Sequence, residues 1–390
     1  MTAFQGKEPV RFSRLLAEIL ERGEQGRGQA VAELSRLFTK ERAALGSDYL
    51  NDRALGAAYL TYFFPVNLCK IQILLNELPD DWSRPPGDRP LRVLDLGAGP
   101  GTGAMAVLDW LNQHDSDALT KLTVVAVDGS EQALKQARSL WTTYTRRIGI
   151  ADEKLILRQV DLARPSRCWG NDVAQRGPYD VIIVANCLNE LFALTQQATA
   201  NLIAELLTRL TPHGTLMLLE PALRETSRAL HRVRDQLLVE NRCTVYSPCL
   251  HERNCPALLD PDNWCHEERA WEAPSWIRQI DREVGFIKDA LKFSYLLLRT
   301  DGRTVADRSP HTFRMVSELR KLKGDTRAWL CNELGRSEVG RLDRVQSDRN
   351  SSWEECQRGT LVRIEGMKRK DGASLARIPA DAVVNIVRPA

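Results

Sequence analysis

The segment from Leu91 to Glu220 constrains the fold most, because short apolar runs alternate in it with amphipathic stretches. The apolar runs have the length and residue types of buried parallel strands and cover residues 91–96, 122–127, 155–160, 179–185 and 214–220. Helices are predicted between them at 102–113, 130–141 and 194–210. An alternation of strands and helices predicts an α/β fold with a doubly wound sheet.

Two flanking regions depart from this pattern. Residues 12–78 read as helices, and short charged β-like runs follow residue 300, at 312–318, 327–331 and 360–365. We therefore predict three parts. They are an N-terminal helical region (1–82), an α/β domain (83–300) that includes a Cys-rich segment (243–270), and a basic β-rich C-terminal extension (301–390).

Composition limits the environment of the chain. Hydrophobic residues make up 43% and charged residues 27%, which is typical of soluble globular proteins. We find no apolar run of the roughly 18 residues that a membrane span needs, and no signal-peptide core at the N-terminus. We therefore predict a cytoplasmic protein with no membrane partner, and the sequence sets no oligomeric state. Nine cysteines in such a chain indicate thiol or metal chemistry rather than disulfides.

A glycine-rich loop joins the first predicted strand to the first helix of the α/β segment. It has the form D-x-G-x-G-x-G and contains Asp95, Gly97, Gly99 and Gly101. Glycines let a backbone turn sharply and approach a ligand closely, but NAD-binding folds use the same device. The loop alone therefore indicates only a nucleotide-type cofactor.

Acidic residues at three successive strand ends favour S-adenosylmethionine (SAM). Asp95 precedes the turn and can meet the cationic amino-acid end of the cofactor. Asp128 ends the second strand, where a carboxylate can hold the ribose hydroxyls, and Asp161 ends the third, where it can reach the adenine amine. Each aspartate alone could equally be a helix cap or a solvated loop residue. Together they favour a SAM site.

The fourth strand leads into Asn186 and Asn189, at the edge where a substrate would meet the methyl group. Either amide could orient an acceptor or cap a helix. The segment is not the Asp/Asn-Pro-Pro-aromatic motif of amino-group methylating enzymes, and the paired Pro-Cys motifs of pyrimidine C5 methylation are missing. The two asparagines are therefore weak catalytic candidates. Methyl transfer needs little beyond alignment of the reactants, so enzymatic activity stays open.

Cys249, Cys255 and Cys265 lie close together and are interleaved with His251 and His266. Their spacing lacks the C-x2-C pairs of zinc fingers and is compatible with a [4Fe–4S] cluster on four thiolates. The candidates for the fourth thiolate are Cys243, Cys331 and Cys356. We favour Cys331, because it ends a strand-like run and precedes a polar turn. A zinc site that uses one of the histidines is the alternative.

These motifs resemble known families. The glycine loop and its acidic partners resemble class I SAM-dependent methyltransferases. The Cys-rich motifs resemble the methyltransferase-like family of small-ribosomal-subunit assembly proteins of bacteria and mitochondria; they are Tyr246-Ser-Pro-Cys249-Leu-His251, Cys255-Pro256 and Asp262-Asn-Trp264-Cys265-His266. The resemblance implies association with the small ribosomal subunit during assembly. It also implies a [4Fe–4S] cluster on Cys249, Cys255, Cys265 and Cys331.

We therefore expect a SAM-binding protein that acts on the small ribosomal subunit or its rRNA, as an rRNA methyltransferase, an assembly factor or both. Two alternatives remain: a non-catalytic assembly factor with a vestigial methyltransferase fold, and a small-molecule methyltransferase with a structural zinc site. Phosphate contacts are expected from the basic stretch after residue 313, with Arg314, Arg320, Lys321, Lys323 and Arg327.

Overall fold

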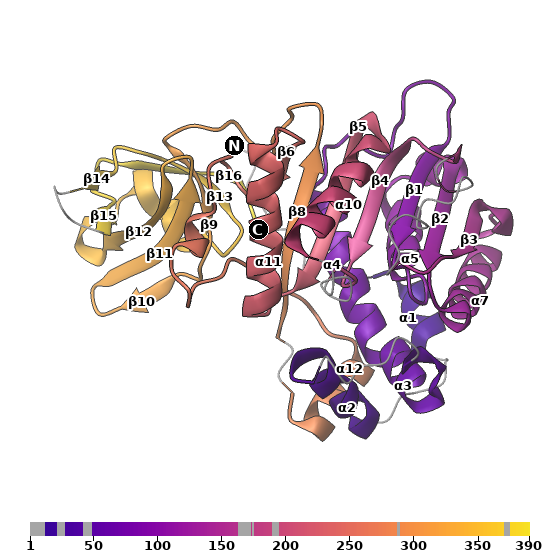
Figure 1. Ribbon diagram of the computed structural model, residues 1–390. Helices are drawn as coiled ribbons and strands as arrows, with labels where there is room; N and C mark the ends of the chain where they lie inside the picture. The colour runs from indigo at the N-terminus through magenta and orange to yellow at the C-terminus, as the bar shows by residue number, and fades with distance from the viewer. Residues whose placement is uncertain are drawn as a thin grey trace.

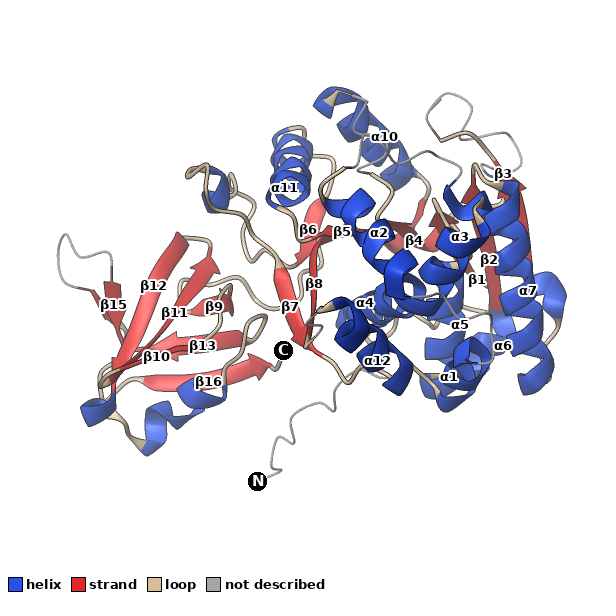
Figure 2. Cartoon of the chain, turned by 90° about the horizontal axis from the view of Figure 1, so that it is seen from below, coloured by secondary structure: helices blue, strands red, loops and turns tan. Residues whose placement is uncertain are grey.

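The structure is a computed structural model of the chain, and it describes residues 12–21, 28–41, 49–162, 173, 175–188, 195–286, 289–369 and 375–390. Two β-sheets form its two halves, and helix α11 (Arg224–Val239) lies between them in the view of Figure 1. The first sheet carries helices on both faces, whereas the second is built almost wholly from strands (Figure 2).

The first sheet has the strand order β3-β2-β1-β4-β5-β8-β6, and β7 pairs with β8. Strands β1 to β5 are parallel, and β8 runs antiparallel to its neighbours β5 and β6. The strands are β1 (Leu91–Leu96), β2 (Leu122–Asp128), β3 (Leu155–Gln159), β4 (Tyr179–Ala185), β5 (Leu210–Pro221), β6 (Thr244–Ser247), β7 (Glu267–Ala270) and β8 (Ala290–Arg299). The strand order reverses between β1 and β4, where open α/β sheets bind ligands. The predicted doubly wound, methyltransferase-like α/β fold is confirmed.

Helices cover the two faces of this sheet because alternate strand residues point to opposite sides. Val93 belongs to a core shared with α4, α5 and α7, and Leu94 to a second core shared with α10 and α11. The helices are α1 (Arg14–Glu21), α2 (Gly28–Thr39), α3 (Arg53–Ala58), α4 (Phe64–Glu77), α5 (Thr102–His114), α6 (Ser116–Lys121), α7 (Glu131–Ile148), α10 (Gln196–Thr208) and α12 (Ser275–Val284), besides α11. Leu16 of α1 and Val31 of α2 join the first core, so the N-terminal helices pack onto the α/β domain.

The second sheet has the order β14-β15-β12-β11-β9-β13-β16, and β10 pairs with β11. The strands are β9 (Thr312–Met315), β10 (Arg320–Leu322), β11 (Asp325–Asn332), β12 (Gly335–Leu342), β13 (Leu361–Glu365), β14 (Lys368–Arg369), β15 (Leu375–Arg377) and β16 (Val383–Arg388). Its own hydrophobic core contains Phe313, Leu330 and Trp353. The predicted β-rich extension is therefore present, with strands where the three β-like runs lie. The domain boundaries at residues 82 and 300 stay a prediction.

One helical stretch of the described residues, Arg53–Glu77, is long and apolar enough by length and composition to cross a membrane. It joins α3 to α4 through a π-helical turn, Tyr59–Phe63. The expectation that no segment reaches that length is therefore wrong. The stretch is apolar because α4 is a core helix of the fold, and 72% of its apolar window is buried against the rest of the protein.

Candidate functional site

The glycine loop turns from β1 into α5 with left-handed backbone at all three predicted glycines. Gly97, Gly99 and Gly101 have φ angles of 71°, 53° and 84°, which side chains disfavour. A Cβ atom at Gly97 would lie 2.6 Å from Sγ of Cys187, so this position has no room for a side chain. The loop needs glycine at Gly97 both for its conformation and for the close approach of the segment after β4.

Asp95 lies at the end of β1 and is only 2% exposed. Its carboxylate accepts the backbone N–H of Ala104 at 2.8 Å, in the first turn of α5. Burial raises the pKa of Asp95 to about 7, and the negative charge of Asp128 adds to that rise. Asp95 therefore braces the loop against α5, and it is poised to change its charge near neutral pH.

Asp128 ends β2 and connects it to the same loop. Its carboxylate accepts the backbone N–H groups of Gly99 and Ser130, each at 2.8 Å. Burial raises its pKa. Asp161 follows β3 and is exposed. The three aspartates thus lie at or just beyond the carboxyl ends of three adjacent strands, as the sequence predicts, and their roles toward a cofactor stay predictions.

The residues after β4 lie beside the glycine loop. Asn186 has a left-handed backbone with φ 58°, and its N–H donates to the carbonyl of Leu219 at 2.7 Å. Left-handed non-glycine residues are uncommon and are enriched at functional sites. Asn189 lies outside the described residues. The catalytic role considered for these asparagines remains a prediction.

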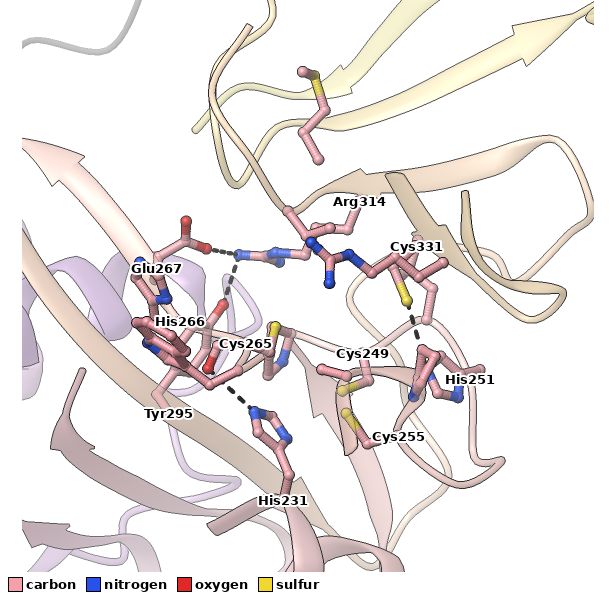
Figure 3. Close-up of a pocket in the computed structure, with 18 residues that line it drawn as sticks. His231, Cys249, His251, Cys255, Cys265, His266, Glu267, Tyr295, Arg314 and Cys331 are labelled. Atoms are coloured by element: carbon pink, nitrogen blue, oxygen red, sulfur yellow. Dashed lines mark hydrogen bonds and ion pairs between the residues drawn. The ribbon is translucent and has the colours of Figure 1, made fainter. Parts of the chain in front are cut away.

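All four predicted cysteine ligands line one cavity of about 50 Å³ (Figure 3). Cys249, Cys255 and Cys265 come from the segment between β6 and β7, and Cys331 enters from β11 of the second sheet. Sγ of Cys331 lies 3.7 Å from Nε2 of His251. The cavity therefore lies between the two halves of the molecule and needs both of them.

Two competing cysteines do not line this cavity. Cys356 is buried in the core of the second sheet, and Cys243 precedes β6 in the second core of the α/β domain. Of the three candidates for the fourth thiolate, Cys331 is the one that lines the cavity, and its role as a ligand stays a prediction.

The electrostatics around the cavity disfavour ionised thiols. Burial raises the pKa of the thiols of Cys249, Cys255 and Cys331. The guanidinium of Arg234 beside Cys249 and Cys255 opposes part of that rise. Burial also lowers the pKa of His251 to about 4, so this imidazole is neutral at pH 7. A bound cationic group would make the thiolate forms favourable.

Helix α11 supports the Cys-rich segment through one polar face. The guanidinium of Arg228 donates to the carbonyls of four residues between Cys255 and Cys265, at 2.6–3.2 Å; they are Ala257, Leu258, Asp260 and Asn263. Arg234 donates to the carbonyls of His251 and Arg253, and Asp235 accepts the N–H of Cys255. These contacts shape a segment that has little regular structure of its own.

Sequence reasoning missed these supporting residues. Arg228, His231, Arg234 and Asp235 recur at intervals of three and four, the spacing of one helix face. The sequence signal is a face of polar residues on a helix that precedes the Cys-rich segment, a pattern that is also typical of a solvated helix.

The described residues contain no group of three or more His, Cys, Asp or Glu side chains arranged to hold a metal ion. The metal-binding role predicted for the Cys-rich segment is not confirmed by this geometry.

The basic stretch of the second sheet divides into buried and exposed cations. Arg314 is 3% exposed and forms ion pairs with Glu77 and Glu267, so the expectation that it contacts phosphate is wrong. Arg327 is partly buried and pairs with Asp325 at 2.7 Å. Arg320, Lys321 and Lys323 are exposed on the β10–β11 hairpin, and Arg320 pairs with Glu338. Of the five residues expected to contact phosphate, the three on this hairpin are the ones exposed to solvent.

Solved structures similar to this one include several methyltransferases. The citrinin polyketide synthase CMeT domain is 15% identical, with 74% of this chain and 69% of that chain covered and a TM-score of 0.39. An O-methyltransferase family protein from Burkholderia thailandensis is 15% identical, with 73% and 68% covered and a TM-score of 0.32. The plantazolicin methyltransferase BpumL, solved with SAH, is 13% identical, with 73% and 99% covered and a TM-score of 0.36. These likenesses are distant, and the fold assignment rests on the strand order above.

Comparison with protein families is more specific. A comparison with curated proteins gives no match. A family model described as mitochondrial small ribosomal subunit Rsm22 matches residues 53–344, which span α3, the glycine loop, the Cys-rich segment and Cys331. The match covers most of the 390 residues and confirms the resemblance noted in the sequence. The chain therefore belongs to the Rsm22 family.

Proposed function

We propose that this protein binds SAM and a [4Fe–4S] cluster and acts on the small ribosomal subunit or its rRNA. It would do so as an rRNA methyltransferase, an assembly factor or both. The observation that carries the proposal is the Rsm22 match over residues 53–344 of a methyltransferase-like fold. The protein would act where small subunits are found, in the cytoplasm on the sequence prediction or in the mitochondrion on the family description.

The glycine loop supports SAM as the cofactor. It lies at the reversal of strand order between β1 and β4, next to Asp95 and Asp128. The exposed Asp161 follows β3 in the same row of strand ends. SAM would supply an electrophilic methyl group. Asp95 would meet its ammonium group and Asp128 its ribose hydroxyls, while the loop lets the ligand approach the backbone.

SAM binding should depend on pH through Asp95. The pKa of this carboxyl is about 7 in the free protein, and an ammonium partner favours its ionised form. SAM should therefore bind more tightly as the pH rises from 6 to 7, where its α-amino group is still mostly protonated, with a Kd about fivefold higher at pH 6 than at pH 7. Isothermal titration calorimetry at both pH values measures this, and Asp95→Asn is the control that should show no such dependence. Equal Kd values for the wild-type protein would refute the role of Asp95.

The thiols that line the cysteine cavity support a [4Fe–4S] cluster. Such a cluster takes four thiolates, one for each iron atom. Cys249, Cys255, Cys265 and Cys331 line the cavity and supply that number. The neighbouring guanidinium groups of Arg234 and Arg314 suit the negative charge of a thiolate-bound cluster.

The β10–β11 hairpin is the proposed rRNA contact. Replacing Arg320, Lys321 and Lys323 together by alanine should weaken binding to small subunits or to their rRNA. The slope of log K against log salt should fall by about 2–3, because each lost phosphate contact removes about 0.9. Sedimentation or filter binding over a salt series measures both quantities.

A matched control removes three exposed cations from the other half of the molecule, namely Lys121, Lys135 and Arg146. This variant changes the net charge equally and should keep the wild-type slope. If both triple variants lower affinity to the same extent, the hairpin has no special role. If the wild-type protein binds small subunits no better than it binds an acidic protein at moderate salt, the ribosomal proposal fails.

A non-catalytic assembly factor is the second candidate. The carboxylates of Asp95 and Asp128 already accept backbone N–H groups, so they maintain the loop whether or not a cofactor binds. Cys187 also packs against Gly97 at the edge where an acceptor would enter. Transfer of labelled methyl from SAM to rRNA of immature subunits would exclude this candidate. Absence of transfer, with subunit binding intact, would favour it.

A further inference from the structure

The proposed metal site is divided between the two sheets. Three thiols belong to the segment between β6 and β7, and the fourth, Cys331, belongs to β11. Hydrophobic contact alone has no direction and would let one half slide on the other. The site is complete only while some directional contact holds the second sheet in place.

We propose that Arg314 is a positioning residue for Cys331, held by Glu77 of the N-terminal helices and Glu267 of the α/β domain. This inference rests on the proposed function for what the site binds. The new element is that a buried ion-pair network sets the position of Cys331, the proposed fourth ligand. This network includes Glu77 of α4, a helix far from the Cys-rich segment in the sequence.

Arg314 and Cys331 are direct neighbours. They are opposite each other in the antiparallel pair of β9 and β11, so their Cα atoms are about 5 Å apart and their side chains lie on the same face. Both side chains line the cysteine cavity (Figure 3). A shift of Arg314 therefore moves Cys331 with it.

Arg314 reaches across the interface to four side chains. It donates to Glu77 at 2.8 Å, Glu267 at 2.9 Å, Ser247 at 3.3 Å and the hydroxyl of Tyr295 at 2.6 Å. All four partners are buried, and Ser247 and Tyr295 also bond to Glu77. Every contact fixes a direction as well as a distance, and a buried charge has no water to replace a lost partner.

The charges of the network are balanced only when the halves are docked. Glu77 and Glu267 face Arg314, and Arg269 forms a second ion pair with Glu267 at 2.7 Å. If the two halves separated, Glu77 and Glu267 would keep only Arg269 as a cationic partner. Arg314, on the second sheet, would lose both of its carboxylate partners. The end of α4 is held again by Arg388 of β16, which donates to the carbonyls of Asn76 and Glu77. The carboxyl end of α4 is thus an anchor for the second sheet, beside contacts such as the ion pair of Arg358 with Glu268 at 3.2 Å.

Alkylation of the metal-free protein tests the position of Cys331 directly. Wild-type, Arg314→Lys and Glu77→Gln proteins would be treated with iodoacetamide, and the rate at each cysteine followed by peptide mass spectrometry. We expect Cys331 to react about tenfold faster in both variants, while Cys249, Cys255 and Cys265 change less than twofold. Circular dichroism would verify that each variant is folded, and Glu77→Gln keeps the test valid if Arg314→Lys does not fold.

Arg341→Lys is the matched control. Arg341 is as buried as Arg314 and lies in the same sheet, but it bonds to Asn350 and Glu354 away from the cavity. It should leave the reactivity of Cys331 unchanged. Unchanged Cys331 reactivity in folded Arg314→Lys and Glu77→Gln proteins, or an equal increase in Arg341→Lys, would overturn the proposal.

The amount of iron bound per chain gives a second test of the role of Arg314. Anaerobically reconstituted Arg314→Lys and Glu77→Gln proteins should hold less iron per chain than wild type, and Arg341→Lys should match wild type. If the wild-type protein binds no iron, the cluster proposal fails while the alkylation result still decides the role of Arg314. If Arg314→Lys and Glu77→Gln proteins both hold as much iron as wild type, and Cys331 is alkylated at the wild-type rate in both, Arg314 does not position Cys331.

Discussion

Cys265→Ser is expected to reduce the iron content of anaerobically purified protein from about four atoms per chain to less than one. Serine is a poor ligand for iron, and three thiolates around a buried cavity cannot complete a four-thiolate site. The broad absorbance at about 400 nm should disappear with the iron. Cys331→Ser should have the same effect, although its sulfur comes from the other sheet.

Cys356→Ser is the control for this prediction. Cys356 is also buried in the C-terminal half, but its thiol donates to the carbonyl of Ser352 and does not line the cavity. This variant should keep wild-type iron, sulfide and absorbance. Colourless wild-type protein with one zinc ion per chain would refute the cluster and restore the zinc alternative.

Gly97→Val should abolish measurable SAM binding, with a Kd at least about 100-fold higher than that of the wild type, or about 2.7 kcal/mol. The φ angle of 71° strains a branched side chain, and the new Cβ would collide with Cys187. Left-handed strain costs about 1–2 kcal/mol and overpacking about 1–3 kcal/mol. The free energy of unfolding should therefore fall by about 2–5 kcal/mol, measured by denaturant titration.

Gly149→Val is the control that introduces the backbone strain of a left-handed residue without a steric collision. Gly149 ends α7 with a φ of 72°, and a Cβ there meets nothing within 4 Å. This variant should lose only the strain energy and should bind SAM like the wild type. Normal SAM affinity in Gly97→Val would show that the loop does not form the cofactor site.

The α/β fold could be predicted from the sequence because short, local sequence patterns specify its strands and helices. Each buried strand is a continuous apolar run, and the helix predicted from residue 130 has Ser130 as its cap, which accepts the N–H of Ala133 at 3.2 Å. The insertion of β8 between β5 and β6 was not predicted. Pairing partners of an isolated strand are chosen by contacts distant in sequence, which a strand pattern does not encode.

The supporting contacts of the cysteine site were less predictable. Arg228 and Arg234 lie on a helix whose polar face looks like a solvated one, and only packing shows that it covers the Cys-rich segment. Arg314 looked like one more cation in a basic stretch. Its position opposite Cys331 and its two carboxylate partners arise from sheet register and from contacts across more than two hundred residues.

The sequence by itself determined the doubly wound fold, the glycine loop with its row of aspartates, and the thiols that would form a site. These depend on residue type and short spacing, which a linear chain displays directly. Only the tertiary structure decided that Cys331 joins the other three thiols, that Arg314 is buried instead of facing phosphate, and that the N-terminal helix α4 anchors the second sheet. The physical reason is that burial and charge pairing are properties of packed surfaces, and these surfaces join segments far apart in the chain.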